Sequence, residues 1–231
     1  METYRELVAA RKSCARCMVE NPALIRNGSE YEFDPGVVSH WSQWLGHQEP
    51  QLLVVGQDFS NAEYFERNEG RDDPKSVTNA NLRKLLQVAG IDVKAPPDRD
   101  PDAPVYLTNS ILCLKHGSMI EPIKPRWIDA CAQHHLVPLA RHLKPQVIVG
   151  MGSGGWRAVR KAFGVIAPDG ILKAAGYEWA TAEGRRAFAV GHCSGLGLRN
   201  RAWSDQLEDW KRIGAALNVS TPQTDRGAAT R

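Results

Sequence analysis

The sequence contains no apolar run that approaches the roughly 20 residues a membrane-spanning helix needs. Its first residues, Met1–Glu6, are charged and lack the apolar core of a signal peptide. We therefore expect a cytoplasmic protein with no membrane contact, in which the cysteines stay reduced. The sequence also lacks a large excess of either positive or negative charge. The net charge of +3, from 29 basic and 26 acidic residues, permits a polyanionic partner without requiring one.

Internal repeats are absent, and no phosphate-binding glycine fingerprint follows the first apolar run. This absence argues against a nucleotide-binding α/β protein with a zinc knuckle. The length of 231 residues and the hydrophobic content of 42% suit one large domain with its own core. We expect that domain to span 1–218, and the polar segment 219–231 to be a disordered tail.

Four short apolar runs are typical of buried strands, at 51–56, 105–109, 146–150 and 186–191. Helical spacing of apolar residues predicts helices over 79–89, 127–143, 154–163 and 203–217, with Pro138 as a kink in the second. The polar segments 67–76 and 94–103 are expected to be irregular connectors. Strands that alternate with helices predict a three-layer α/β/α sandwich around a mostly parallel, four-stranded sheet.

Polar residues follow three of these strands at their carboxyl ends, where open α/β sheets bind ligands. Asp58, Asn109 and His192 should therefore meet at one rim of the sheet. The first and last of these loops contain glycine, including Gly56, so that their backbones can approach a ligand closely.

Four cysteines form a candidate metal site. Cys14 and Cys17 make a CxxC pair, Cys113 follows the second strand, and Cys131 lies in the predicted helix after it. Four thiolates suit either zinc or an iron–sulfur cluster, and composition does not separate the two. Cys193 lies away from this pattern and is interpreted as a loop residue.

The order of these motifs resembles the uracil-DNA glycosylase superfamily: Gly-Gln-Asp at 56–58, Thr-Asn at 108–109 and His-x-Ser-x-Leu at 192–196. The cysteine positions are similar to those of its iron–sulfur branch. There a CxxC pair opens the chain, a third cysteine follows Thr-Asn, and a fourth precedes a Pro-x-Val-Ile-Val strand, here 145–149. The resemblance spans about 14–217.

What the resemblance implies is a monofunctional DNA repair glycosylase. Such an enzyme hydrolyses the N-glycosidic bond of uracil, or a related deaminated base, flipped out of DNA. It also implies a monomer whose four cysteines hold a structural [4Fe–4S] cluster, with zinc as the alternative.

Three residues would carry the reaction in such an enzyme. Asp58 would position the water that attacks the sugar C1′ and stabilise positive charge on the sugar. Asn109 would pair with uracil O4 and N3–H and mismatch cytosine. His192 would donate to uracil O2 as negative charge builds on the leaving base. The alternatives are a capping aspartate, a turn asparagine and a structural histidine.

Other residues would bind the substrate. Leu196 would enter the duplex in place of the extruded base, with Arg199 and Arg201 near flanking phosphates. Base stacking is expected from Phe65 first, then from Phe59 or Tyr64, although these rings are equally suited to the core. The remaining expected contacts come from the same strand-end loops: Gly56, Gln57 and Ser194.

The chain also departs from its apparent relatives. Gly-Gln-Asp matches the superfamily prototype, whereas the iron–sulfur branch usually has a Gly-Glu-Ala-Pro-Gly type of loop. The prototype continues with Pro-Tyr, whose tyrosine excludes thymine, and this chain has Phe59-Ser60 there. Cys193 replaces the proline of a His-Pro-Ser loop. These departures motivate an alternative hypothesis, a non-catalytic protein that binds nucleic acid or lesions on the same scaffold.

Overall fold

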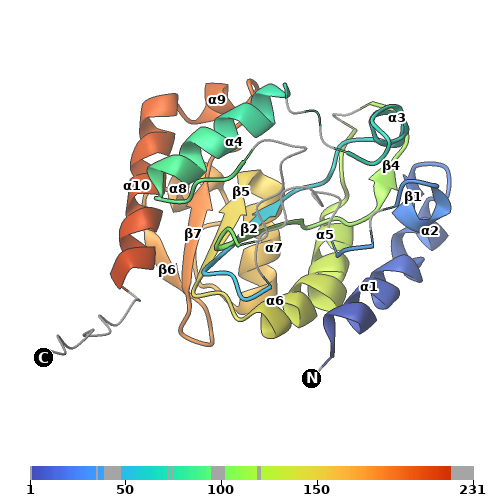
Figure 1. The fold of residues 1–231 in the computed structure, drawn as a ribbon, viewed down its shortest axis with the longest axis horizontal. Coiled ribbons are helices and arrows are strands. Elements are labelled where there is room, and N and C mark those ends of the chain that lie inside the picture. Colours follow the sequence, from blue (N-terminus) through green and yellow to red (C-terminus); the bar gives the residue numbers. More distant parts are fainter. Residues whose placement is uncertain are drawn as a thin grey trace, which may run out of the picture.

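The computed structural model describes residues 2–34, 36–38, 48–71, 73, 75–94, 102–118 and 121–219 (Figure 1). Its centre is a five-stranded sheet with the order β3-β2-β5-β7-β6. The strands are β2 (Leu52–Gly56), β3 (Val105–Asn109), β5 (Val147–Met151), β6 (Glu178–Ala180) and β7 (Arg186–Val190). All neighbours pair in parallel except β6, which runs antiparallel to β7. The predicted α/β class and the four predicted strands are confirmed.

The expected number of four strands was wrong, because the edge strand β6 was missed. Its three residues, Glu178–Ala180, alternate between exposed and half-buried positions. A segment of three residues is too short to show an apolar run, so that only its pairing with β7 makes it a strand.

The helices cover both faces of the sheet. The α-helices are α1 (Tyr4–Lys12), α2 (Arg16–Glu20), α3 (Ala62–Arg67), α4 (Val77–Val88), α5 (Pro125–Cys131), α6 (Val137–Leu143), α7 (Gly152–Phe163), α8 (Ile171–Ala174), α9 (Gly197–Asn200) and α10 (Trp203–Val219). The described residues also form a 3-10 turn, η1 (Gly28–Glu30), and a π-helical turn, η3 (Ala132–Leu136).

The central strands are buried along their whole length, because each face of the sheet supports a separate core. Leu52 and Val54 belong to the core beneath α4 and α10, whereas Leu53 and Val55 belong to the core beneath α1, α5, α6 and α7. Figure 1 shows α4 and α10 on one side of the sheet and α1, α5 and α6 on the other. This two-sided burial explains why the strands are continuous apolar runs, and it gives the predicted three layers.

A second, two-stranded sheet joins the N-terminal region to the loop after β3. Strand β1 (Ile25–Arg26) pairs antiparallel with β4 (Leu114–Lys115). The pairing is extended by the backbone N–H of His116, which donates to the carbonyl of Leu24. Neither strand was predicted, because two residues are too few to show an alternating pattern.

The helix expected over 127–143 is present but not regular. It consists of α5, the π-helical turn and α6, and the turn lies just before Pro138. Proline has no N–H to donate and crowds the preceding turn, so that a widened turn at this point is its expected effect. The predicted helices over 79–89, 154–163 and 203–217 correspond to α4, α7 and α10.

Parts of the expected irregular segments lie outside the described residues, namely 95–101 and 220–231. The expected tail began one residue too early, because α10 continues to Val219. Among the helices that the structure describes, none is both long and apolar enough to cross a membrane.

Candidate functional site

The loops after β2 and β3 are joined by backbone contacts. The N–H of Ser110 donates to the carbonyl of Gly56 (2.8 Å), and the N–H of Ile111 donates to the carbonyl of Gln57 (2.9 Å). The Ser110 hydroxyl donates to that same Gln57 carbonyl (2.8 Å). These bonds extend the parallel pairing of Gly56 with Asn109 beyond the strand ends. Asp58 and Asn109 therefore lie in loops whose backbones are fixed relative to each other.

The Asp58 carboxylate is held by three donors. Its Oδ1 accepts from the backbone N–H of Ser60 (3.2 Å), and its Oδ2 accepts from the Gln57 amide (3.1 Å) and from Lys115 Nζ (3.1 Å). The side chain is 11% exposed, so that one edge reaches solvent. A carboxylate oxygen has two lone pairs, and among the described residues Oδ1 has a single donor. The carboxylate is thus oriented with acceptor capacity left at Oδ1.

Asn109 ends β3 with a buried side-chain amide. The residue is 2% exposed, and among the described residues neither its Nδ2 nor its Oδ1 has a hydrogen-bond partner. A buried amide without partners costs roughly 1–3 kcal/mol, which makes such groups rare in folded proteins. Nothing in the described fold needs this amide, so that a ligand offering one donor and one acceptor would fit it. Such a ligand reaches Asn109 only after neighbouring side chains shift.

His192 is held as a neutral ring in one tautomer. Its Nδ1 accepts from the backbone N–H of Ser194 (3.2 Å) and lies 2.8 Å from the Ser194 hydroxyl, which itself accepts from the N–H of Gly197 (3.2 Å). Because a backbone N–H only donates, Nδ1 carries no proton and Nε2 carries the ring proton. Burial lowers the pKa of His192, although the negative charge of Asp58 opposes that shift. The ring is therefore a neutral donor at Nε2.

Two glycines leave room for His192. Gly152 begins α7 with a φ of +70°, and a Cβ there would lie 3.3 Å from the His192 Cβ. At Gly197 a Cβ would lie 2.0 Å from the His192 carbonyl oxygen. Any side chain at Gly197 would therefore displace the His192 backbone.

Side chains from α4 and α10 hold the loop that contains His192 in place. The Asn81 amide in α4 donates to the carbonyl of Cys193 (2.8 Å), and the Gln206 amide in α10 donates to the carbonyl of His192 (3.4 Å). The thiol of Cys193 points into the core and donates to the carbonyl of Thr78 (3.3 Å). Cys193 is thus a packing residue of the loop, away from the other cysteines.

The tip of this loop is exposed. Leu196 is 62% exposed, one of the large apolar side chains on the surface, and Arg199 in α9 is exposed as well. Arg201 instead donates two hydrogen bonds to the buried Asp209 (2.5 and 2.8 Å). The phosphate contact expected for Arg201 therefore competes with an internal ion pair, whereas Leu196 and Arg199 remain accessible.

The aromatic residues expected to stack on a base are part of the core. Phe65 is fully buried, Phe59 is 6% exposed, and their rings meet edge to face at 5.6 Å. Tyr64, half-buried, packs on Phe59 with ring centroids 5.8 Å apart. The ring of Phe65 has no exposed face in this conformation, so that stacking on a base by Phe65 stays a prediction that requires neighbouring side chains to shift. Phe59 and Tyr64 are the aromatic residues nearer the surface.

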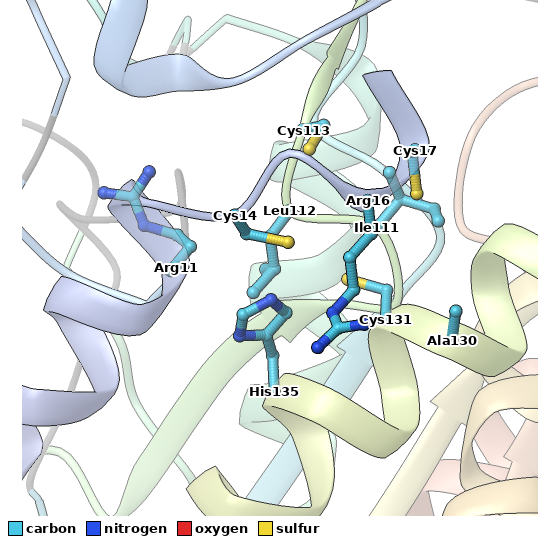
Figure 2. Close-up of a pocket in the computed structure, with 10 residues that line it drawn as sticks. All are labelled: Arg11, Cys14, Arg16, Cys17, Ile111, Leu112, Cys113, Ala130, Cys131 and His135. Carbon is cyan, nitrogen blue, oxygen red and sulfur yellow. The ribbon is translucent and has the colours of Figure 1, made fainter. Parts of the chain in front are cut away.

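Four cysteines line a single cavity on the opposite face of the sheet, in the core beneath α1, α5, α6 and α7. Cys14 precedes α2, Cys17 lies in it, Cys113 follows β3, and Cys131 ends α5. Figure 2 shows these side chains arranged around the cavity, with Arg16 and His135 beside them. The antiparallel pairing of β1 with β4 brings the first pair close to Cys113. The three segments that were expected to share a metal site therefore do meet.

Burial and mutual repulsion make the thiolate forms of these cysteines unfavourable. Burial raises the pKa of Cys17 to about 11 and that of Cys113 to about 12, and the neighbouring Cys14 adds to both shifts. The pKa of Cys131 is raised well above its usual value for the same reasons. A bound metal compensates such repulsion, because it binds the thiolate. The donor set therefore suits a cationic metal or cluster.

Two residues of the site were missed in the sequence. Lys115, in β4, donates to Asp58 and is 2% exposed. The sequence did contain a clue to its role: Lys115 directly follows the apolar run Ile111–Leu114, where a solvent-exposed lysine is not expected. Ser60 has a φ of +124°, a backbone conformation that side chains disfavour. Nothing in the sequence marked Ser60, because serine is common in loops.

No protein-family model matches the chain, and no curated protein matches its sequence. The class of protein is therefore defined by the fold and the site alone. It is a three-layer α/β/α protein with a carboxylate, an amide that is unpaired among the described residues, and a neutral imidazole at the carboxyl edge of its sheet.

Proposed function

We propose that this chain is a monofunctional DNA glycosylase of the uracil-DNA glycosylase superfamily, acting on uracil or a related deaminated base. The observation that carries the proposal is the Asn109 amide, which is buried with both ends unpaired among the described residues. Uracil offers the matching pair of groups, an acceptor at O4 and a donor at N3–H. Cytosine offers the reversed pair, so that in the amide orientation that fits uracil it would leave both ends mismatched, which costs much more than a lost methyl contact.

Asp58 supports the hydrolytic step. Hydrolysis of the N-glycosidic bond develops positive charge on the sugar and needs a water molecule held near C1′. The free acceptor capacity of Asp58 Oδ1 is suited to orienting that water and accepting its proton. The three donors on the carboxylate fix its orientation before substrate binds.

His192 supports departure of the base. The leaving uracil gathers negative charge at O2, and a neutral Nε2–H stabilises that charge through a hydrogen bond. Ser194 and Gly197 impose the required tautomer from the opposite side of the ring. Leu196, exposed at the tip of the same loop, is suited to filling the space of an extruded base.

The cavity lined by four cysteines supports a bound metal, and the resemblance to the iron–sulfur branch favours a [4Fe–4S] cluster, with zinc as the alternative. In a cluster each thiolate binds its own iron, whereas the four sulfurs of a zinc site stand about 2.3 Å from one ion. The cluster would be held by the four cavity cysteines, Cys14, Cys17, Cys113 and Cys131. It would cross-link the N-terminal region, the loop after β3 and helix α5.

Base release from synthetic oligonucleotides tests the function. The purified, metal-loaded protein is incubated with single strands and duplexes that contain uracil, hypoxanthine or xanthine. We expect release of uracil, a loss of about 100-fold or more for Asp58→Asn, and weaker selectivity against cytosine for Asn109→Asp. Asp129→Asn is the matched control, since Asp129 pairs with Arg157 on the surface, 35% exposed.

The outcomes separate the two hypotheses. Release of no deaminated base from either single- or double-stranded DNA would overturn the glycosylase proposal. Tight binding of uracil-containing DNA without release would instead support the non-catalytic binding protein. A wild-type rate of base release in Asp58→Asn would show that Asp58 has no role in the hydrolytic step.

A further inference from the structure

Lys115 forms a buried ion pair with Asp58. Its side chain is 2% exposed, and its Nζ donates to Asp58 Oδ2 (3.1 Å) and to the carbonyl of Glu121 (3.3 Å). Burying an ammonium group costs several kcal/mol unless it is paired and hydrogen-bonded. A hydrophobic residue would fill this place more cheaply, so that the pair is not explained by packing alone.

The backbone of Lys115 is held from two sides. In β4 it pairs with Ile25 of β1, and it forms a bridge with Asn61 in the loop that follows Asp58. The Asn61 side chain donates to the carbonyl of Gly117 (2.6 Å), two residues after Lys115. Lys115 therefore approaches Asp58 from a rigid support that includes the N-terminal region.

The charge of Lys115 indicates what the pair does. A cation beside Asp58 weakens the attraction between that carboxylate and a developing positive charge on the sugar. Lys115 thus does not help to stabilise the sugar cation. Lys115 instead orients the Asp58 carboxylate. Together with the Gln57 amide it donates to Oδ2, so that Oδ1 keeps acceptor capacity for a water molecule.

We propose that Lys115 is a positioning residue for the hydrolytic step, acting by fixing the Asp58 carboxylate with Oδ1 towards the attacking water. The proposal rests on the glycosylase function proposed above. Lys115 itself does not contact the substrate. Its removal should slow the chemical step and leave DNA binding unchanged, because misplacement of a reacting group by about 1 Å costs up to roughly 100-fold in rate.

The test compares Lys115→Met with Lys115→Gln in single-turnover base release on uracil-containing DNA. We expect kcat to fall about 10- to 100-fold in Lys115→Met with KM within about twofold. Lys115→Gln retains an N–H donor and should lose less. Lys211→Met is the matched control, because Lys211 is 62% exposed in a surface ion pair with Glu208 and should retain the wild-type rate.

A double-mutant cycle identifies the partner. In an Asp58→Asn background, Lys115→Met should change the residual rate less than about twofold, since the group it positions has gone. An equal loss in both backgrounds would overturn the proposal, as would a wild-type kcat in a folded Lys115→Met protein. If Lys115→Met does not fold, as judged by circular dichroism, Lys115→Gln decides by the same comparison. Absence of base release by the wild-type protein overturns the function itself, whereas failure of the inference appears only in the variants.

Discussion

At the scale of single residues, the segment after β2 combines a functional group with backbone strain. Ser60 has a φ of +124° and donates its N–H to Asp58 Oδ1. A side chain in such a conformation costs of order 1–3 kcal/mol and is retained only where surrounding contacts enforce it. The strained turn is what directs the Ser60 N–H at the carboxylate.

Replacement of Ser60 by glycine should relieve this strain. We expect Ser60→Gly to raise the free energy of unfolding by about 1 kcal/mol, because the gain in the folded state exceeds the added flexibility of the unfolded chain. Ser60→Ala keeps a Cβ and should give no such gain. Thermal unfolding of the two variants, followed by circular dichroism, measures the difference. Equal stability of the glycine and alanine variants would contradict a strained Ser60.

At the scale of elements, the π-helical turn between α5 and α6 places a histidine in the core. His135 in this turn is 7% exposed beside the cysteine cavity, whereas its neighbour His134 is exposed. Burial is the main cause that lowers the pKa of His135 from 6.5 to about 4, and the positive charges of His134, Arg11 and Arg16 lower it further. The turn therefore holds a neutral imidazole in an apolar layer.

The stability of the protein should fall in mild acid because of His135. The unfolded chain takes up a proton below pH 6.5, and the folded protein does so only near pH 4. Stability from this group is thus present at neutral pH and is lost as the pH falls from about 6.5 towards 4. Between pH 7 and pH 5 the loss is about 2 kcal/mol.

Melting temperatures of three proteins check this effect. His135→Gln should show a smaller decrease between pH 7 and pH 5 than the wild-type protein, by several degrees. His134→Gln should reduce the decrease only slightly, since His134 is exposed and contributes less than burial does to the lowered pKa of His135. The same pH dependence in all three proteins would show that His135 titrates normally.

At the scale of the whole molecule, the cysteine cavity connects parts of the chain that are far apart in sequence. The N-terminal region carries Cys14, just before α2, and Cys17 in α2, while the loop between β3 and β4 carries Cys113 and α5 carries Cys131. The segment after Cys113 continues directly into Lys115, which contacts Asp58. A cluster in this cavity would stabilise the support of the reactive carboxylate without taking part in the reaction.

Removal of single cysteines tests this connection. Alanine at any of the four cavity cysteines should lower the iron content from about four per chain, abolish the visible absorbance and decrease the melting temperature. Cys193→Ala should retain the iron, because Cys193 lies in the opposite core. Metal analysis and absorption spectra measure both effects. Stoichiometric zinc without iron in the wild-type protein would contradict the iron–sulfur interpretation.

The fold class was predictable because it depends on local patterns. Runs such as Leu52–Gly56 are apolar on both faces, and the helix α4 buries Leu82, Leu85 and Leu86 as its spacing predicted. The short strands β1, β4 and β6 were not predictable. With two or three residues each, they are defined by their pairing partners rather than by their own composition.

The sequence by itself determined the α/β class, the strand ends that carry Asp58, Asn109 and His192, and the three segments that carry the cavity cysteines. These follow from composition and spacing along the chain. Only the tertiary structure decided that Phe65 is core, that Asn109 has no partner in the part of the chain described, and that Lys115 pairs with Asp58. Burial and pairing are properties of neighbours in space, and contacts between distant segments leave no regular pattern in a single sequence.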